Sequence, residues 1–419
     1  MPSTAVKDGG ILTKTQNLIQ LYNHWVGRSE IPAEYHLWAC ISMIAACVSD
    51  KVWVTKFRSN LTPNLYTFLI GPSGSGKGTA ISAMLSLVDE DKVNYYNGRT
   101  TAQYMLDSMA FPTRDQKEKG IDSTKLFVLS PELAMSVGKG DQADTLIKIM
   151  TELYGGAGAR TIKEGTRTRG GIEIENPCIN WLAGTTVEWL KDCCTSDAME
   201  GGFFARVVPV VGRYDFSRAN RFVRPIFPPD QEIVKGYLKA RISQLSTLNG
   251  EFALTDAAKE LEEFWYHNRD EPEDSSMVPW WGRQHDLSLK LAMVFSLADS
   301  PTLVIERQHL GAAQRVIHSI GKNLPEIIRY TATTDDSKDI QVVLDIIKRN
   351  KRIGHSALLR RISYRGIHAR QLIEIINTLR QANQIAVVLG PRKSNLYLSK
   401  NGANLTIPAK KKRGRPKSA

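Results

Sequence analysis

The sequence LYTFLIGPSGSGKGTAISAMLSLV, residues 65–88, decides the fold predicted for this chain of 419 residues. Leu65 to Ile70 is a short apolar run typical of a buried strand, and Ala80 to Val88 has the apolar spacing of a helix. Between them stands a glycine-rich loop with the spacing Gly-x4-Gly-Lys. In a strand–loop–helix context this spacing is the Walker A phosphate-binding pattern. The sequence therefore predicts an α/β P-loop NTPase core.

The residue types in this loop suit the binding of phosphate. Glycines allow backbone N–H groups to point at phosphate oxygens, and the N-terminus of the following helix adds partial positive charge. A lysine in this place reaches the β- and γ-phosphates of a nucleotide. The predicted nucleotide-binding residues of the loop are Gly71, Pro72, Ser73, Gly74, Ser75, Gly76, Lys77, Gly78 and Thr79, and Lys77 is also predicted to be catalytic. A glycine-rich turn that binds no ligand is the alternative interpretation.

The loop departs from the usual pattern directly after its lysine. Gly78 stands where Ser or Thr normally follows, and Thr79 comes one position later. Thr79 is therefore the predicted Mg²⁺ ligand, and the predicted cofactors are ATP and Mg²⁺. Nucleoside monophosphate kinases tolerate the same Gly-Lys-Gly-Thr arrangement, so a small-molecule kinase is one alternative.

A second apolar run, Leu126 to Ser130, predicts a strand that leads to Glu132. A carboxylate in this place can activate water, so Glu132 is a predicted catalytic residue. The metal-binding Asp that usually precedes it is absent, because Ser130 and Pro131 occupy that place. The alternative is that Glu132 only favours the dipole of the following helix.

Two further polar positions adjoin predicted strands. Thr185 and Thr186 follow the run Cys178 to Ala183, where a polar side chain can face a ligand crevice or simply cap the next helix. Arg206 precedes the run Val207 to Val211, at a glycine-containing turn. An arginine there can reach the γ-phosphate held by a neighbouring subunit, as an arginine finger, or can form a surface ion pair.

The runs PNLYTFLIGPSGSGKGT, LFVLSPELA, PCINWLAGTTVEWL and GGFFARVVPV together resemble the P-loop ATPases of phages and integrated mobile elements. That family is often described as a domain of unknown function, lies beside or fused to primase modules, and is similar to helicase-type and AAA+ ATPases. The resemblance covers about residues 15 to 320. It implies that Lys77 and Thr79 bind nucleotide and that Glu132 is catalytic. It also implies that Thr185 senses the γ-phosphate, while Arg206 and Arg283 contact it.

Charge and pattern divide the chain into regions. The net charge of +12 is concentrated from residue 338 onward, where 19 Lys and Arg stand against 3 acids. Such asymmetry indicates a polyanionic partner, most simply DNA. The polar residues 112–124 are expected to form an exposed loop. The predicted regions are a helical region 1–56, a P-loop ATPase core 57–228, a helical domain 229–330, a linker 331–337, a winged-helix DNA-binding domain 338–400 and a disordered basic tail 401–419.

Residues 338–400 contain three helical patterns, at 340–349, 355–362 and 366–384, followed by a hairpin with a basic turn. This order resembles a winged helix-turn-helix, whose third helix enters the major groove of DNA. The predicted DNA-binding residues are Tyr364, Arg365, His368 and Arg370 near the start of the third helix, and Arg392 and Lys393 on the hairpin. A protein-docking module is the alternative.

The tail contains Arg413-Gly414-Arg415-Pro416 within a basic run and looks like an AT-hook. The narrow minor groove of A·T-rich DNA is strongly negative and attracts arginine. Gly414 allows the backbone to lie in that groove, and Pro416 keeps the exit extended. The alternatives are a solvated basic tail and a nuclear-import signal.

Several protein classes are disfavoured. The longest nearly apolar run, residues 38–48, is too short to span a bilayer, and residues 1–10 carry no apolar signal region. Five cysteines without metal-ligand spacing predict neither a disulfide framework nor a zinc site. We therefore expect a cytoplasmic, nucleoid-associated protein without membrane contact.

Together these features predict an ATP-dependent DNA-binding protein of phage or mobile-element replication, helicase-like or DNA-remodelling. The placement of Arg206 predicts a homo-oligomer such as a ring, and a primase or another replication protein is a further expected partner. The main alternative is a DNA-binding initiator or regulator that ATP switches without being hydrolysed.

Overall fold

The computed structural model describes residues 17–27, 29–98, 101–138, 140–155, 161–166, 170–193, 202–213, 228–332, 335–350, 352–363, 367–389 and 395–399. The chain forms two compact units, one ending at Thr331 and the other beginning at Ala332. Each unit has a buried apolar core of its own, as expected for separate domains.

The first unit is built on a five-stranded sheet in which every strand pair is parallel. In spatial order its strands are β4 (Tyr95–Asn97), β5 (Lys125–Ser130), β8 (Cys178–Thr185), β3 (Tyr66–Ile70) and β9 (Val207–Val211). The four strands predicted from apolar runs are all present, and the short edge strand β4 was not predicted. The predicted α/β architecture is confirmed.

Strand β3 lies between β8 and β9, and all of its residues are buried. On one face, Phe68 stacks edge-on against Trp181 of β8, with ring centroids 5.1 Å apart. On the other face, Thr67 accepts a hydrogen bond from Ser42 of α2 (Ala33–Val48) at 3.0 Å. A parallel strand covered on both sides appears in the sequence as a continuous apolar run, which is why β3 was predictable.

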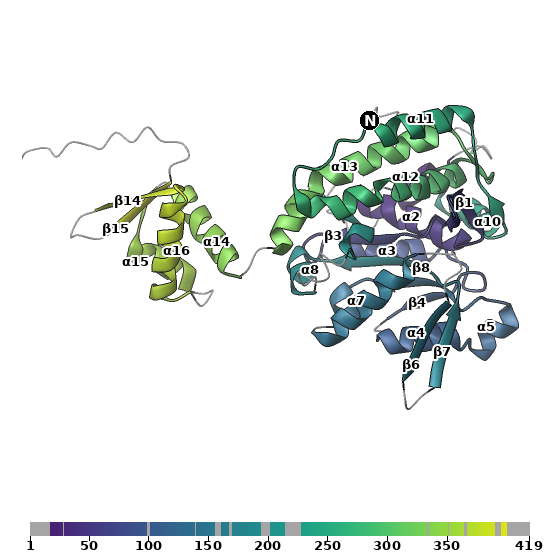
Figure 1. Cartoon of the computed structure of the whole chain (residues 1–419), viewed down its shortest axis with the longest axis horizontal. Coiled ribbons are helices and arrows are strands. Elements are labelled where there is room, and N and C mark those ends of the chain that lie inside the picture. The colour runs from purple at the N-terminus through teal and green to yellow at the C-terminus, as the bar shows by residue number, and fades with distance from the viewer. Residues whose placement is uncertain are drawn as a thin grey trace, which may run out of the picture. The chain divides into compact units, whose positions relative to one another are not determined.

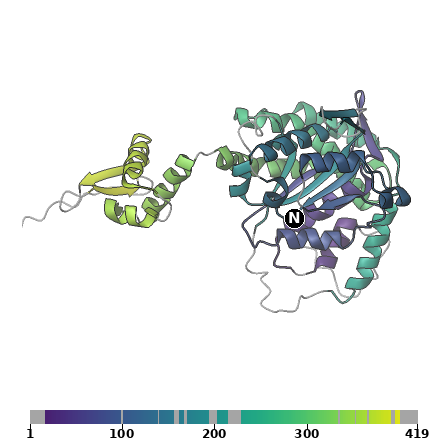
Figure 2. The ribbon, with the colours of Figure 1, turned by 90° about the horizontal axis from the view of Figure 1, so that it is seen from below.

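Helices cover both faces of the sheet (Figures 1 and 2). In Figure 1, α11, α12 and α13 lie on one side of it, while α4 and α7 lie on the other. The other helices and turns of this unit are α1 (Leu18–Val26), α3 (Lys77–Leu85), α4 (Ala102–Ala110), α6 (Leu133–Val137), α7 (Asp141–Leu153), α8 (Val187–Cys193), η1 (Phe204–Arg206), α10 (Gln231–Leu245), α11 (Asp256–His267), η3 (Ser275–Met277), α12 (Val278–Asp299) and α13 (Arg307–Ala332).

The first unit also contains smaller sheets of two or three strands. The hairpin of β6 (Thr161–Thr166) and β7 (Gly170–Glu175) is antiparallel and was not predicted. The remaining short strands are β1 (Val52–Lys56), β2 (Ser59–Leu61), β10 (Gly250–Glu251), β11 (Ala253–Leu254) and β12 (Val304–Ile305). Strand β1 lies inside the region 1–56 that was predicted to be helical throughout, and its pairing with β2 and β10 stabilises the extended backbone.

The segment 112–124 differs from the exposed loop predicted for it. It contains the helix α5 (Arg114–Lys119), which begins with a capping box formed by Thr113 and Gln116. No residue of α5 is buried, so the helix lacks the apolar periodicity by which helices are recognised in a sequence. Its stability comes from its cap and its exposed charges instead.

The second unit contains the three predicted helices and the hairpin. Its elements are α14 (Asp335–Asn350), β13 (Arg352–Gly354), α15 (His355–Ile362), α16 (Ala369–Gln381), β14 (Ile385–Leu389) and β15 (Asn395–Ser399). The strands form an antiparallel sheet in the order β13-β15-β14. Leu372, Ile375, Ile376 and Leu379 of α16 are buried in its core. Because α13 continues to Ala332 and α14 begins at Asp335, helix occupies most of the predicted linker.

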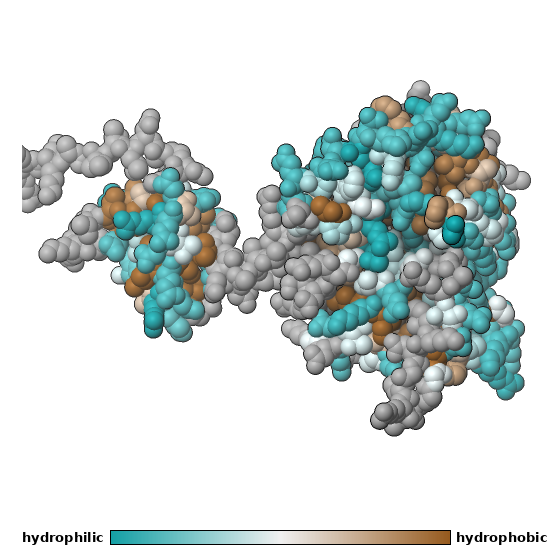
Figure 3. Space-filling model, viewed as in Figure 1, coloured by the Kyte–Doolittle hydropathy of each residue, from teal (hydrophilic) through white to brown (hydrophobic). Residues whose placement is uncertain are grey.

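Many apolar side chains are buried in the two cores. Hydrophilic residues cover much of the described surface seen in Figure 3, with separate smaller apolar areas. Among the described residues, no helix combines the length and apolar character that a membrane crossing requires.

The charged side chain of Lys290, on α12, is buried in the first unit with 2% of its surface exposed. Its ammonium donates hydrogen bonds to the backbone and side-chain oxygens of Asn64 and lies 4.5 Å from the ring centroid of Tyr154. No carboxylate of the described residues forms an ion pair with it. Burial lowers the pKa of Lys290 to about 7, because the charged ammonium loses its hydration there.

Lys290→Met is expected to remove a pH dependence of stability. The ordinary pKa of lysine is 10.5. Between about pH 7 and pH 10 the unfolded state therefore holds a proton that the native state has released, and wild-type stability rises with pH. Relative to the variant, the wild-type free energy of unfolding should rise by about 4 kcal/mol across this window. Denaturant unfolding at both pH values measures this, with the exposed Lys239→Met as control; parallel wild-type and Lys290→Met profiles would contradict the lowered pKa.

Candidate functional site

The glycine-rich loop connects the carboxyl end of β3 to the first turn of α3, as the sequence pattern predicts. Gly74 and Gly76 have positive φ angles of 79° and 83°, which favour glycine over residues with a Cβ atom. Lys77 is the first residue of α3, so the loop lies at the helix N-terminus, where backbone N–H groups lack intrahelical partners. This arrangement offers N–H donors and partial positive charge to an anion.

The N-terminal region packs directly against this loop. A Cβ atom at Gly76 would lie 2.6 Å from Ile31, and one at Gly71 would lie 2.1 Å from the Tyr35 hydroxyl. That hydroxyl donates a hydrogen bond to the carbonyl of Ile70, at the end of β3, at 2.8 Å. The loop glycines are therefore needed for packing as well as for phosphate binding. Sequence reasoning missed Ile31 and Tyr35, because no motif marks them.

Lys77 is held by its own loop. Its ammonium donates to the carbonyl oxygens of Gly71 at 2.8 Å and Pro72 at 2.7 Å, and to the hydroxyl of Ser75 at 3.2 Å. Burial lowers the pKa of Lys77, while the nearby charge of Glu132 acts in the opposite direction. A phosphate group bound in the loop would take over part of this hydrogen bonding, because it is the stronger, charged acceptor.

A cavity of about 440 Å³ lies against the loop and brings several predicted residues together. It is lined by Ser73–Thr79, Pro131–Ala134, Gly184–Thr186 and Trp189. The close approach depends on Gly184, where a Cβ atom would lie 2.4 Å from the carbonyl oxygen of Pro131 and 3.2 Å from the Cβ of Lys77. The predicted residues Lys77, Thr79, Glu132 and Thr185 therefore meet at one cavity, at the carboxyl ends of β3, β5 and β8.

Ser130, the last residue of β5, and Glu132, two residues later, have different surroundings. Glu132 stands before α6 and makes no side-chain capping bond, so its carboxylate is available to the cavity that it lines. Ser130 is fully buried and accepts a hydrogen bond from the indole N–H of Trp181 at 3.1 Å. Ser130 stands in the usual place of the metal-binding Asp, and its side chain is therefore part of the buried core.

The hydrogen bonds of Thr185 and Thr186 show which of the two caps the next helix and which can face a ligand. The Thr186 hydroxyl accepts from the backbone N–H of Trp189 at 3.2 Å and so caps α8. Thr185 ends β8, and its hydroxyl donates to the carbonyl of Thr186 at 3.2 Å while the residue lines the cavity. Thr186 therefore has the capping role, which leaves Thr185 as the candidate for ligand contact.

The polar groups at the cavity fit ATP with Mg²⁺, although few of them could contact the metal. The loop supplies N–H groups and Lys77 for phosphates, and the cavity adds the Thr79 hydroxyl and the Glu132 carboxylate. Mg²⁺ is commonly held by one or two carboxylates together with substrate phosphates and water. Thr79 is the protein group that would contact Mg²⁺ beside the phosphates, because Glu132 is the predicted catalytic residue. Among the described residues, no group of three or more His, Cys, Asp or Glu side chains could form a metal site.

Arg206 and Arg283 do not lie at this cavity. Arg206 directly precedes Val207, which pairs with Tyr66 at the start of β3, whereas the loop follows Ile70 at its end. The length of β3, about 13 Å from Tyr66 to Ile70, therefore separates Arg206 from the loop of its own chain. The positive charge of Arg283 lowers the pKa of Arg206, after the larger effect of burial, so the two arginines lie near each other.

In the second unit, two predicted DNA-binding residues can be placed. His368 stands at the N-cap of α16 in a capping box with Gln371, which gives its side chain a structural role. Arg370 is exposed on α16, with its Nε 3.6 Å from a carboxylate oxygen of Glu374. The predicted residues Tyr364, Arg365, Arg392, Lys393, Arg413, Gly414, Arg415 and Pro416 lie outside the described residues.

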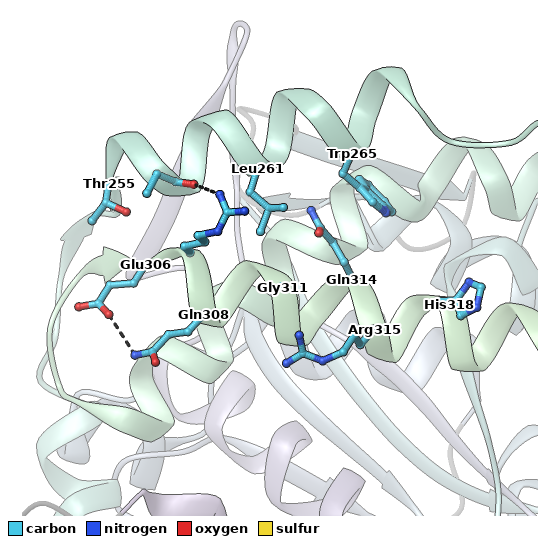
Figure 4. Close-up of a pocket in the computed structure, with 11 residues that line it drawn as sticks. Thr255, Leu261, Trp265, Glu306, Gln308, Gly311, Gln314, Arg315 and His318 are labelled. Atoms are coloured by element: carbon cyan, nitrogen blue, oxygen red, sulfur yellow. Dashed lines mark hydrogen bonds between the residues drawn. The ribbon is translucent and has the colours of Figure 1, made fainter. Parts of the chain in front are cut away.

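A larger groove, of about 990 Å³, lies between α11 and α13 (Figure 4). Its lining includes Leu261 and Trp265 of α11, and Gln314, Arg315 and His318 of α13. The side-chain amide of Gln314 points toward α11 in Figure 4, and its nitrogen has no hydrogen-bond partner in the part of the chain that the structure describes. None of the predicted site residues lines this groove.

Comparisons with known proteins add little to this geometry. No protein-family model matches the sequence, and no curated protein matches it. Among solved structures, the chain is similar to a full-length MCM homolog from Methanopyrus kandleri, with 14% sequence identity and a TM-score of 0.40. The match covers 71% of this chain and 58% of that protein, so this chain spans less than two thirds of its length. The candidate site rests on its own residues.

Gly76→Ala and the adjacent Gly78→Ala are expected to differ sharply in nucleotide binding. A methyl group at Gly76 meets Ile31 and a positive φ angle, whereas one at Gly78 meets only Pro131 at 3.8 Å. Gly76→Ala should weaken binding of a fluorescent ATP analogue at least about 10-fold and lower thermal stability, and Gly78→Ala should change affinity by less than about threefold. Equal affinities of the two variants would contradict the constrained loop.

Proposed function

We propose that this chain is an ATP-dependent DNA-binding protein of phage or mobile-element replication, with a helicase-like or DNA-remodelling ATPase core. The observation that carries the proposal is the convergence of the phosphate loop, Glu132 and Thr185 on one cavity. These residues are far apart in the sequence, and the order β5-β8-β3 brings them to one edge of the sheet.

In this proposal each cavity residue has a distinct task. Lys77 exchanges its loop acceptors for the β- and γ-phosphates, and the loop N–H groups hold the remaining phosphate oxygens. Glu132 orients a water molecule in line with the γ-phosphate and accepts its proton. Thr185, between the strands of the loop and of Glu132, hydrogen bonds to the γ-phosphate and so distinguishes triphosphate from diphosphate. Bound Mg²⁺ would supply neutralisation of the phosphate charge.

The second unit is proposed to bind DNA as a winged helix. Its order of helices followed by a hairpin, with a three-stranded antiparallel sheet, fits that class. Helix α16 would enter the major groove with the exposed Arg370, and Arg365, Arg392 and Lys393 would add phosphate contacts. Because His368 caps α16, we assign it to positioning that helix rather than to reading bases. The tail around Arg413 and Arg415 would follow the minor groove of A·T-rich DNA.

The position of Arg206 supports a homo-oligomer. Arg206 lies where the amino ends of the strands meet, which we call the amino edge of the sheet. It can therefore contact only a nucleotide held by another copy of the chain. A closed ring would supply one such arginine to every site. The same reasoning makes Arg283 a candidate for contact across the interface rather than within its own chain. A primase or another replication protein remains the proposed further partner.

A switch that binds ATP without hydrolysing it is the second candidate. It is favoured by Ser130, whose hydroxyl is tied to Trp181 in the place where a metal-binding Asp is expected. A slow or absent hydrolytic step would leave ATP as a conformational effector of DNA binding. A nucleotide kinase is a weaker candidate, because it gives the basic second unit no role.

Wild-type protein is expected to hydrolyse ATP and to do so faster with single- or double-stranded DNA. Lys77→Ala should abolish ATP binding, whereas Glu132→Gln should retain binding and lower kcat by about 10²- to 10⁴-fold. Glu188→Gln is the matched control, because it makes the same charge change at an exposed residue of α8 outside the cavity. Steady-state phosphate release and ATP-binding titrations provide both readouts.

Each alternative predicts a different result in those assays. ATP binding without turnover, with or without DNA, would overturn the motor and favour the switch. Transfer of phosphate to a nucleoside monophosphate would favour the kinase. Failure of the wild type to bind ATP would overturn all three.

Charge removal in the second unit is expected to weaken DNA binding in a salt-dependent way. Arg392→Ala with Lys393→Ala should lower affinity for all DNA sequences alike. It should also reduce the slope of log K against log salt by about 2, since each phosphate contact contributes about 0.9. Lys235→Ala with Lys239→Ala, on α10 of the first unit, is the control with an equal charge change. Fluorescence anisotropy at several salt concentrations checks this, and equal slopes for both double variants would contradict it.

A further inference from the structure

Three basic side chains gather around Tyr154, the residue that follows α7. The ammonium of Lys290 lies 4.5 Å from the centroid of the Tyr154 ring, and the guanidinium carbon of Arg206 lies 5.9 Å from the same centroid. Arg283 is close enough to lower the pKa values of both Arg206 and Lys290. Within the described ranges, neither Arg206 nor Lys290 has a carboxylate at ion-pair distance. The ring is therefore their shared neighbour in place of an acid, through its electron-rich face.

The Tyr154 ring is itself fixed by its surroundings. It packs edge-on against Tyr66 of β3, with centroids 4.9 Å apart. The backbone oxygen of Tyr154 accepts a hydrogen bond from the Asn64 amide at 3.2 Å, and Asn64 also receives both hydrogen bonds of Lys290. The ring, Asn64 and Lys290 thus form one buried assembly that joins α7, α12 and the start of β3.

Arg206 contacts the Tyr154 ring of this assembly, but the assembly does not supply acceptors for all of its hydrogen-bond donors. Its Nη1 donates to the carbonyl oxygen of Gly202 at 2.7 Å, whereas its Nε is buried with no hydrogen-bond partner among the described residues. The predicted alternative of a surface ion pair does not occur among the described residues. A half-buried guanidinium with an unused donor is suited to an incoming anion, since burial strengthens a charge-assisted hydrogen bond.

We propose that Tyr154 and Lys290 are positioning residues for Arg206, which they hold at the amino edge of the sheet for contact with a phosphate bound by a neighbouring copy. The inference rests on the proposed function, in which Arg206 acts across a subunit interface. Tyr154 restrains the guanidinium through its ring face, and Lys290 fixes the ring by binding Asn64. A shift of α12 would then move the ring and Arg206 together.

Removal of the ring should impair turnover without impairing ATP binding. We expect Tyr154→Leu to lower kcat by about 10- to 100-fold with the ATP KM changed less than about threefold, because misplacing a group that acts on the transition state costs this much. The conservative variant Tyr154→Phe keeps the ring face and should retain activity within about threefold. Lys290→Met keeps the ring but removes the hydrogen bonds that hold Asn64 beside it, so it should lower kcat less than Tyr154→Leu does. It also serves as a second variant if Tyr154→Leu does not fold.

Mixing variants tests whether the effect acts between subunits. A Tyr154→Leu copy has an intact phosphate loop and a misplaced Arg206, whereas a Lys77→Ala copy has the reverse. Equal mixtures of the two should recover turnover, as should Arg206→Ala mixed with Lys77→Ala. Tyr154→Leu mixed with Arg206→Ala should recover none, because no copy then presents a correctly placed arginine.

The outcomes separate this inference from the function on which it rests. Absence of ATP turnover by the wild type would overturn the proposed function and the positioning role with it. Wild-type turnover with Tyr154→Leu and Lys290→Met both unchanged would overturn the positioning role alone. Failure of Lys77→Ala to restore folded Tyr154→Leu, while it restores Arg206→Ala, would also overturn it, because the defect would then lie outside Arg206.

Discussion

The parallel hydrogen bonding of β3 to β8 on one side and to β9 on the other determines where the functional groups of this molecule lie. The pairing extends beyond the strands, since the N–H of Gly71 donates to the carbonyl of Thr185 and that of Gly212 to the carbonyl of Ile70. Because all strands run in the same direction, residues that follow a strand gather at one edge of the sheet and residues that precede a strand gather at the other. The phosphate loop and Arg206 are separated for this reason.

Close approach at the loop edge depends on residues without side chains. Gly71 and Gly212 both face the Tyr35 ring, Gly76 faces Ile31, and Gly184 faces Pro131. A methyl group at any of these positions would come within 2.6 Å of another atom. The N-terminal helices are thereby packed onto the same loop that is proposed to bind phosphate. A change of loop conformation on nucleotide binding would therefore be felt by α2, which also contacts α10 and α12.

Electrostatics differs between the two edges of the sheet. At the loop edge Lys77 has three oxygen acceptors from its own loop, and the carboxylate of Glu132 is nearby. At the opposite edge the basic side chains of Arg206 and Lys290 contact the Tyr154 ring, and no carboxylate of the described residues pairs with them. A basic edge and a loop proposed to bind phosphate would be complementary once a nucleotide is bound, which supports the proposed association of copies of the chain.

The sequence by itself determined the strands β3, β5, β8 and β9, the phosphate loop, and the helices and hairpin of the second unit. These elements carry local signals, namely apolar runs, helical periodicity and glycine spacing, that depend little on distant contacts. It did not reveal α5, because an exposed helix has no apolar stripe, nor β1, whose extended form depends on pairing with β10 nearly 200 residues later. Only the tertiary structure decided that Glu132 and Thr185 share a cavity with Lys77 and that Arg206 does not. It alone placed Arg206 and Lys290 around the Tyr154 ring. Such contacts follow from the lateral order of strands and the packing of helices, which no local pattern encodes.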